Sequence, residues 1–346
     1  MPDDPDLPPD APASHPPDAP VRRGRVTARG LNLRVTPDTA QPPLTVLPRG
    51  TALAIDAVVG RWYAVRTPLG DGFVHGDFVA LDSPIDDPAS PDAGFLHERP
   101  ALREVPLPAP DARRLMADPA RSTPTTRRLA STWNALGGLL LPICDRLWLD
   151  PSLALVVLVV ESSGRGFGAD GRLTIRVEVH KFWSHWGIDH ADVFDRHFRF
   201  DASRRWQGHR VRDGEHAPWE TFHGRQAGEW RAFDLARTLD EDAALRAISM
   251  GMPQIMGFNH PKIGYGSPQA MFARFTADVR WHALGLFDFI TGPGQASTML
   301  DDLRRGQFEA FATAYNGQGQ AVRYADRLAQ HRDAFATLRP APAGDA

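Results

Sequence analysis

The sequence predicts a multidomain protein in which a small all-β barrel precedes a mainly α-helical domain with a short β-hairpin. Two observations predict this order. Residues 25–82 consist of short β-rich runs separated by Gly, Pro and Asp, whereas apolar residues recur at helical spacing from residue 122 onward. The chain has 346 residues, room for about two domains, and it carries proline-rich segments before and after the β-rich part.

The first 24 residues are acidic and proline-rich, and we expect them to be disordered because they cannot bury enough apolar surface to offset the entropy lost on ordering. They lack the charged-then-apolar pattern of a secretory signal, so we expect synthesis in the cytoplasm. Residues 83–121 are again proline-rich and acidic, and they predict a linker with little order. Residues 341–346 are expected to be a short tail.

Within residues 25–82 we expect about five strands in under sixty residues, which suggests a small barrel. Gly70-Asp71-Gly72 lies between two alternating segments and indicates a hairpin.

The helical domain is predicted over residues 122–340. Ser122, before Pro124, indicates a capped helix that continues through Leu141. Pro151 to Val160 is apolar on all sides, which predicts a buried central helix with its proline at the first helical position. Apolar and polar residues alternate over residues 173–182, which predicts a short strand of a hairpin.

Further helices are predicted downstream. One opens at Asp240 and continues through Ile248, and Ser267-Pro268 caps one long helix with a single apolar stripe. Three more are expected at residues 298–305, 307–315 and 320–337, and Asn316-Gly317 supplies the stop of the second.

Composition excludes several classes of protein. The formal net charge is −3, so we expect no nucleic-acid partner. Cys144 is the only cysteine, which excludes an intrachain disulfide and a four-thiolate zinc site. The most apolar stretch, Leu153 to Val160, is far shorter than the roughly 20 residues that span a bilayer, so no membrane insertion is expected.

Glu161 is the first candidate for chemistry. It directly follows the apolar helix and precedes a glycine-rich turn. A carboxyl group at the end of a buried helix lies in low dielectric, which disfavours its charged form and raises its pKa, as a general acid requires. The alternative is a solvated glutamate at a helix end, where the dipole disfavours negative charge.

A second candidate is the run Arg176-Val-Glu178-Val-His180, whose three polar side chains share one face if the segment is a strand. That face could hold a second carboxylate next to Glu161. The alternative is an ion pair between Arg176 and Glu178 on a wet surface.

Two further segments carry polar groups in loops or at helix ends. Residues 249–260 (SMGMPQIMGFNH) are punctuated by Gly and Pro, so that backbone and amide groups can face a polar ligand, and their methionines suit core filling. Tyr315-Asn316-Gly317 places a phenol at the last turn of a helix and by itself indicates only a helix stop.

No metal or cofactor is expected. His180, His185 and His190 are spaced by five, which suits neither a helix face nor a strand face, and no His-Glu-x-x-His motif is present. The glycines at 164, 166 and 168 follow a helix and are no dinucleotide fingerprint.

Taken together, four stretches in order resemble the N-acetylmuramidase domain of phage endolysins and other bacterial cell-wall hydrolases. They are LVVESSGRGF, RVEVHKFW with VFDRHFRF, ISMGMPQIMGFNH with IGYGS, and FATAYNGQGQ, and the resemblance covers about residues 122–338. The wider similarity is to goose-type lysozymes and soluble lytic transglycosylases, and it implies a lysozyme-like fold. The resemblance implies Glu161 as the catalytic acid and Glu178, less clearly, as a second carboxylate. We expect the substrate contacts to be Ser162, His180, Gln254, Ile255, Asn259, Tyr315 and Asn316.

Residues 25–82 are similar to bacterial SH3 modules in the phrases GLNLR, LPRG, GRWYAVR and GFVH. Such modules often bind cell-wall peptides. The segment departs from them by an extended turn at Pro42-Pro43. The resemblance therefore implies peptidoglycan glycan strands, and stem peptides, as partners.

The expected reaction is cleavage of the β-1,4 bond between N-acetylmuramic acid and N-acetylglucosamine. Carboxyl groups ~6.5–9.5 Å apart would accommodate a water and invert the anomeric centre, whereas ~5–5.5 Å would favour a covalent route. A lytic transglycosylase giving anhydro products, a non-catalytic wall-binding protein and a zinc amidase remain alternatives. We expect action on the wall after delivery by a phage pore or a secretion machine, the latter with an immunity protein as partner.

Overall fold

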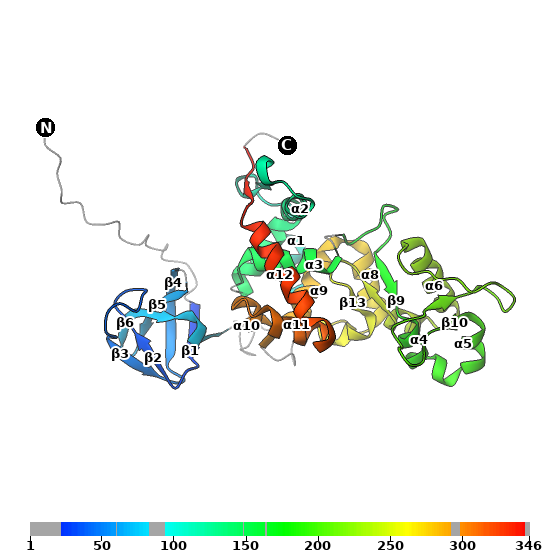
Figure 1. The fold of residues 1–346 in the computed structure, drawn as a ribbon, viewed down its shortest axis with the longest axis horizontal. Helices are drawn as coiled ribbons and strands as arrows, with labels where there is room; N and C mark the ends of the chain where they lie inside the picture. The colour runs from blue at the N-terminus through cyan, green and yellow to red at the C-terminus, as the bar shows by residue number, and fades with distance from the viewer. Residues whose placement is uncertain are drawn as a thin grey trace. The chain divides into compact units, whose positions relative to one another are not determined.

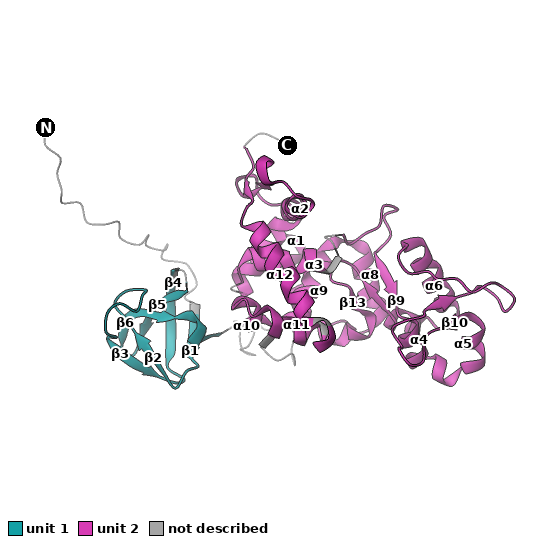
Figure 2. Cartoon of the chain, in the orientation of Figure 1, with its two compact units in different colours: residues 1–86 teal, residues 87–346 magenta. Residues whose placement is uncertain are grey.

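The computed structural model describes residues 22–59, 61–82, 94–147, 149–162, 165–291 and 298–342. The chain divides into two compact units, residues 1–86 and residues 87–346 (Figure 2). The first is β-rich and the second is mainly helical with small sheets, so the predicted fold class is confirmed.

Strands build the first unit. Five form one antiparallel sheet in the order β6-β5-β4-β1-β7, and β2 pairs with β3. The described strands are β1 Arg22–Val26, β2 Gly30–Leu33, β3 Thr45–Pro48, β4 Ala52–Val59, β5 Trp62–Thr67, β6 Gly70–His75 and β7 Val79–Asp82, with the 3₁₀ turn η1 Gly76–Phe78 before the last. The described part of this unit therefore has seven strands, two more than the expected five.

Alternation along these strands produces the core of the barrel. Leu31 and Leu33 point inward, with exposed fractions of 5% and 1%, while Asn32 between them is half-buried. The apolar residues of this core are Val26, Leu31, Leu33, Leu47, Leu53, Ile55, Val65, Val74 and Val79.

The predicted hairpin joins β5 to β6, with Thr67 opposite Gly70. The turn residues are 68 and 69, so Gly70-Asp71-Gly72 is not the turn itself but the start of β6. Gly70 has a φ of +122°, a conformation that favours glycine.

The prediction of disorder over residues 1–24 is wrong for residues 22–24. These residues belong to β1, where Gly24 pairs with Leu53 of β4 and with Leu81 of β7. Backbone pairing on both sides orders a segment whose composition alone predicts none. Residues 1–21 lie outside the described part.

Helices dominate the second unit (Figure 1). They are α1 Pro100–Glu104, α2 Pro124–Leu147, α3 Pro151–Ser162, α4 Val179–His185, α5 Ala191–His197, α6 Gln226–Leu239, α7 Glu241–Arg246, α8 Pro268–Ala277, α9 Val279–Thr291, α10 Thr298–Arg304, α11 Phe308–Asn316 and α12 Ala321–Phe335. The 3₁₀ segments are η2 Leu96–Glu98, η3 Asp111–Arg113, η4 Pro119–Arg121, η5 Gly187–Asp189, η6 Gly257–Ile263 and η7 Gln318–Gln320. Within the described residues no helix is both long enough and apolar enough to span a bilayer.

Short antiparallel sheets complete the unit. The largest has the order β13-β12-β9, and the others pair β10 with β11 and β8 with β14. Their strands are β8 Leu115–Met116, β9 Ile175–Val177, β10 Phe198–Arg199, β11 Arg210–Val211, β12 Ile248–Met250, β13 Ile255–Met256 and β14 Arg339–Pro340.

The central helix is α3, as predicted. Its N-terminus is capped by Asp150, whose Oδ1 accepts a hydrogen bond from the Ser152 amide at 2.7 Å. Every residue from Leu153 to Val160 is buried, and the helix packs against α2 and α12 (Figure 1). At the other end, Arg327 of α12 donates to the Val160 carbonyl at 2.7 Å, which satisfies one of the carbonyls that a helix C-terminus leaves unpaired.

The prediction of little order over residues 83–121 is wrong for residues 94–121. Leu96 and Leu102 are buried there, with exposed fractions of 1% and 2%. Asp288 of α9 anchors the segment, because its carboxylate accepts hydrogen bonds from the backbone amides of Leu96 and His97 at 2.5 and 3.2 Å. The proline-rich composition does not reveal this anchor because it lies about 190 residues away in sequence.

Four other boundaries differ from the predictions. α2 continues to Leu147 rather than ending at Leu141. Thr123, rather than Ser122, caps α2 by accepting from the Thr126 amide at 3.1 Å. The long helix after Ser267 is two helices, α8 and α9, which meet at the extended residue Asp278. The helix that opens at Asp240 ends at Arg246, so Ile248 belongs to β12.

Candidate active site

Glu161 and Ser162 are the last two residues of α3. Their side chains lie outside the described part of the structure. The backbone nevertheless places Glu161 at the end of a helix whose preceding eight residues are all buried.

The loop that follows α3 and the turn between β12 and β13 converge on one imidazole. A Cβ on Gly166 would lie 2.4 Å from Nδ1 of His282, and one on Gly251 would lie 3.0 Å from its Cγ, so both loops pack directly against the ring. His282 Nε2 donates to the Phe275 carbonyl at 2.7 Å, and its Nδ1 accepts from the Met252 amide at 3.3 Å. Burial lowers the pKa of His282 to about 4, so its neutral ring holds the two loops together at pH 7.

Gln254 lies in the turn between β12 and β13 with a φ of +49°, the left-handed region that non-glycine residues seldom adopt. Its amide stabilises the turn, because Nε2 donates to the Gly251 carbonyl at 2.8 Å and Oε1 accepts from the Ser249 hydroxyl at 2.9 Å. Tyr315 donates its hydroxyl to the Pro253 carbonyl at 3.3 Å and thereby joins the last turn of α11 to this loop.

The other residues of this region that we expect to bind substrate are less accessible or lie outside the described side chains. Ile255 and Asn259 are buried, with exposed fractions of 4% and 8%. Asn316 is the last residue of α11, and its side chain lies outside the described residues. The structure thus brings residues 251–254 and Tyr315 together, as the order of the motifs suggests.

A groove of about 1080 Å³ lies along the loop that follows α3. Arg165, Phe167 and Asp170 of that loop line it, together with Thr174 and Gln226. Arg128 of α2 contributes a second cation to its wall. Such polar and charged walls suit a ligand rich in hydroxyl and carboxylate groups.

Glu178 is placed differently from the prediction. The strand β9 ends at Val177, and Glu178 precedes the helix α4 that carries His180, so Arg176, Glu178 and His180 do not share a strand face. They still meet, because Arg176 Nε donates to Glu178 Oε1 at 2.8 Å and His180 Nδ1 lies 3.5 Å from Oε2. Burial lowers the pKa of His180 to about 4, which leaves its ring neutral at pH 7.

Three residues that sequence reasoning missed extend this cluster. His209 lies beside Glu178 and His180, and it connects through His223 to the buried carboxylate of Glu229. Burial also lowers the pKa of His209. Glu178, His180 and His209 offer ligand atoms that could together hold a metal ion. No spacing in the sequence reveals the cluster, because its members lie in or next to α4, in the segments before and after β11, and in α6. The only signal in the sequence is that these residues are histidines and glutamates, which can bind metals.

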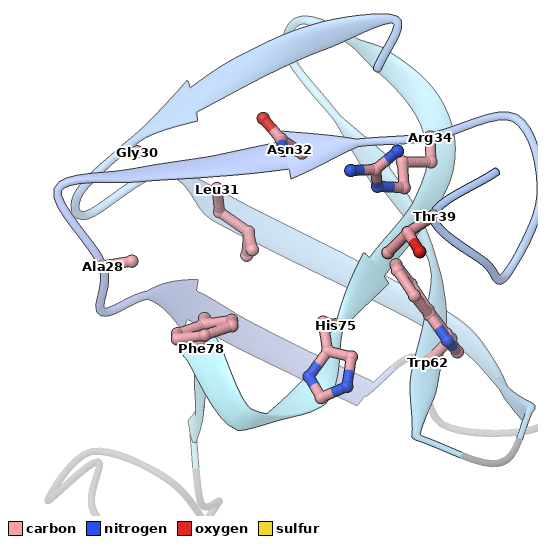
Figure 3. A pocket seen from close by; sticks show the side chains of 9 residues that line it. All are labelled: Ala28, Gly30, Leu31, Asn32, Arg34, Thr39, Trp62, His75 and Phe78. Carbon is pink, nitrogen blue, oxygen red and sulfur yellow. The ribbon is translucent and has the colours of Figure 1, made fainter. Parts of the chain in front are cut away.

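The first unit carries a smaller groove of about 220 Å³ (Figure 3). Trp62, His75 and Phe78 form an aromatic wall, and the rings of Trp62 and His75 meet edge to face with centroids 5.1 Å apart. Asn32 and Arg34 of the β2 region supply polar groups at the same groove (Figure 3). This combination suits a peptide that has both apolar and charged groups.

Comparison with known proteins identifies the larger unit. The model of the N-acetylmuramidase family matches residues 150–336, more than half of the chain. The chain belongs to the N-acetylmuramidase family. The bacterial SH3 domain model matches residues 29–80 of the chain. The comparison with curated proteins found no match to the chain. Among solved structures it is similar to the crystal structure of Burkholderia AP3 phage endolysin, with 23% identity over 64% of this chain and 74% of that chain, and a TM-score of 0.45.

The family assignment confirms the predicted resemblance for both parts of the chain. Membership of this family supports a glycoside hydrolase that acts on peptidoglycan, and the SH3 module indicates binding to the cell wall. The match begins at residue 150, just before α3, and it includes the stretches that carry Glu161, Glu178, Gln254 and Tyr315.

Proposed function

We propose that this N-acetylmuramidase cleaves the β-1,4 bond between N-acetylmuramic acid and N-acetylglucosamine, with Glu161 as the general acid. The observation that carries the proposal is the position of Glu161 at the end of α3, directly after the buried residues Leu153 to Val160. The proposal requires low-dielectric surroundings for this carboxyl group, because they raise the pKa of a carboxyl and let it donate a proton to the leaving glycosidic oxygen.

The groove along residues 165–170 is the proposed seat of the glycan strand. Its polar residues Thr174 and Gln226 can bond sugar hydroxyls. Arg128 and Arg165 favour carboxylates, which the stem peptides carry and which muramic acid carries where no peptide is attached. Gln254 and Tyr315 shape the neighbouring loop and are proposed to position the sugar through it.

Glu178 is the proposed second carboxylate. Arg176 donates to its Oε1 and leaves Oε2 to activate a water or to stabilise an oxocarbenium-like centre. If no carboxylate reaches the anomeric carbon, the 6-hydroxyl of the muramic acid itself attacks and an anhydro product forms. That outcome would make the enzyme a lytic transglycosylase.

Glu161→Gln tests the proposal. The amide keeps the shape of the side chain but has no acidic proton, so turnover of purified sacculi should fall by about 10²–10⁴-fold while the fold persists. Glu309→Gln, at an exposed position in the first turn of α11, is the matched control and should keep wild-type activity.

Mass spectrometry of the released muropeptides reports the reaction itself. Reducing N-acetylmuramic acid ends support hydrolysis, whereas anhydro ends overturn it in favour of transglycosylation. New amino termini without new sugar ends would indicate an amidase. Retention of more than about 1% of turnover in Glu161→Gln contradicts the role of Glu161 as the acid.

A further inference from the structure

A continuous chain of histidines and carboxylates lies next to β9, outside the helix end that carries Glu161. Its members are Glu178, His180, His209, His223 and Glu229. The His209 side chain is fully buried, and Glu229 is 3% exposed. The other three side chains are half-buried. Burying titratable groups costs free energy unless they are paired, so this cluster calls for an explanation.

Three of these groups surround one point. His180 Nδ1 lies 3.5 Å from Glu178 Oε2 and 3.4 Å from His209 Nε2. A tetrahedral metal with bonds of roughly 2.0–2.1 Å holds its ligand atoms about 3.4 Å apart. These two spacings match the edges of a metal coordination sphere, and they exceed the length of an ordinary hydrogen bond. Glu178 Oε2 lies 3.9 Å from His209 at its Nδ1, and the ligand atoms of all three residues lie within 4.8 Å of one another.

The remaining two groups orient His209. His209 Nδ1 lies 2.8 Å from His223 Nε2, and His223 Nδ1 lies 2.8 Å from Oε1 of Glu229. The second oxygen of Glu229 accepts from the Val177 amide at 2.8 Å, which fixes the carboxylate next to β9. Histidines that bind metals commonly donate their other ring N–H to such a partner.

His209 Nε2 lies 3.0 Å from the Arg205 carbonyl oxygen, which only accepts, so without a metal this nitrogen donates a hydrogen bond to that oxygen. A metal bound through Nε2 replaces this proton, so metal binding is expected to release a proton.

We propose that Glu178, His180 and His209 form a binding site for one divalent transition-metal ion of the zinc class. Two imidazoles and one carboxylate favour zinc, cobalt or nickel over magnesium and calcium, which prefer oxygen ligands. Arg176 already occupies Oε1 of Glu178, so the carboxylate binds through Oε2 alone.

The site does not rest on the proposed role of Glu161, because binding is measured without substrate. A metal on Oε2 takes the oxygen that the proposed reaction assigns to water activation. The metal-loaded form is therefore expected to be the less active one.

The test is isothermal titration of the full-length, untagged and chelator-treated protein with Zn²⁺, together with the visible absorption of the Co²⁺ complex. We expect one ion per chain. His180→Ala, which removes a half-buried ligand, should weaken binding at least tenfold, and His223→Gln should weaken it about 10–100-fold by releasing His209. His185→Ala, at an exposed position on the same helix α4, is the matched control and should bind as the wild type does.

Two results overturn the proposal: no saturable binding of Zn²⁺ or Co²⁺ below about 100 µM, or equal affinity in wild type and His180→Ala. Circular dichroism of each variant verifies that it is folded, and His180→Ala keeps the test decisive if a substitution at the buried His209 unfolds the protein. Glu161→Gln should bind the metal as the wild type does, so a failure of the metal site and a failure of the proposed reaction are told apart.

Discussion

Replacing His282 should change how the stability of this protein depends on pH. The imidazole is fully buried between the loops of Gly166 and Gly251, and burial lowers its pKa from 6.5 to about 4. In the unfolded chain the ring regains its ordinary pKa and binds a proton more readily. The contribution of the neutral ring is therefore fully present above pH 6.5 and is lost as the pH falls towards 4.

The magnitude follows from these two pKa values. Between pH 7 and pH 5 the unfolded state becomes almost fully protonated at this ring while the folded state remains mostly neutral. Linkage then lowers the free energy of unfolding by about 2 kcal/mol over this interval from His282 alone. Other buried histidines add to the total loss in the wild type, so the difference between variants isolates this ring.

Urea denaturation at pH 7 and at pH 5 measures the effect. His282→Gln should be less stable than the wild type at pH 7, because the two loops must repack around the new side chain. Between pH 7 and pH 5, however, its free energy of unfolding should fall by about 2 kcal/mol less than that of the wild type. His216→Gln, at an exposed position, is the control and should keep the wild-type loss. An equal loss in the wild type and in His282→Gln would refute the reasoning.

Three further substitutions test other parts of the fold. Asp288→Asn turns one of the accepting oxygens that hold residues 96 and 97 into a donor, so thermal or urea unfolding should reveal a loss of about 3 kcal/mol; wild-type stability would disprove the anchor. Ser267 caps α8 through the Ala270 amide at 3.1 Å, and Ser267→Ala should cost about 1 kcal/mol whereas Ser267→Asp should retain most of the stability. Trp62→Ala removes the largest ring of the groove in the SH3 module and should weaken sedimentation with purified sacculi about tenfold or more, with the exposed Trp206→Ala as control; unchanged sedimentation would move wall binding elsewhere.

Much of the fold was predictable because the relevant signals are local. The apolar run of α3 predicts a buried helix without any partner, and Pro151 and Asp150 fix its start. Alternation in the first unit predicts strands for the same reason, since the period of side chains in a strand is two. The predictions failed where distant residues supply the stabilisation, as when Asp288 orders the proline-rich segment before α2.

The same division holds for the candidate site. Glu161 could be singled out because the helix that leads to it is continuous in the sequence. The switch from strand to helix at Glu178 was not visible, because β9 is a strand only through its pairing with β12. His209 and His223 could not be chosen among many histidines, since nothing local distinguishes a residue whose partners lie 29 and 14 positions away.

By itself the sequence determined the order of the two units, the buried helix that ends at Glu161 and the motifs of a wall hydrolase. Each of these depends on neighbours within a few residues, where propensity and periodicity act. The tertiary structure alone decided that His282 joins two loops, that residues 94–121 pack on the helical unit, and that Glu178 lies among histidines. Those features depend on contacts between distant segments, whose free energy appears only when the chain folds.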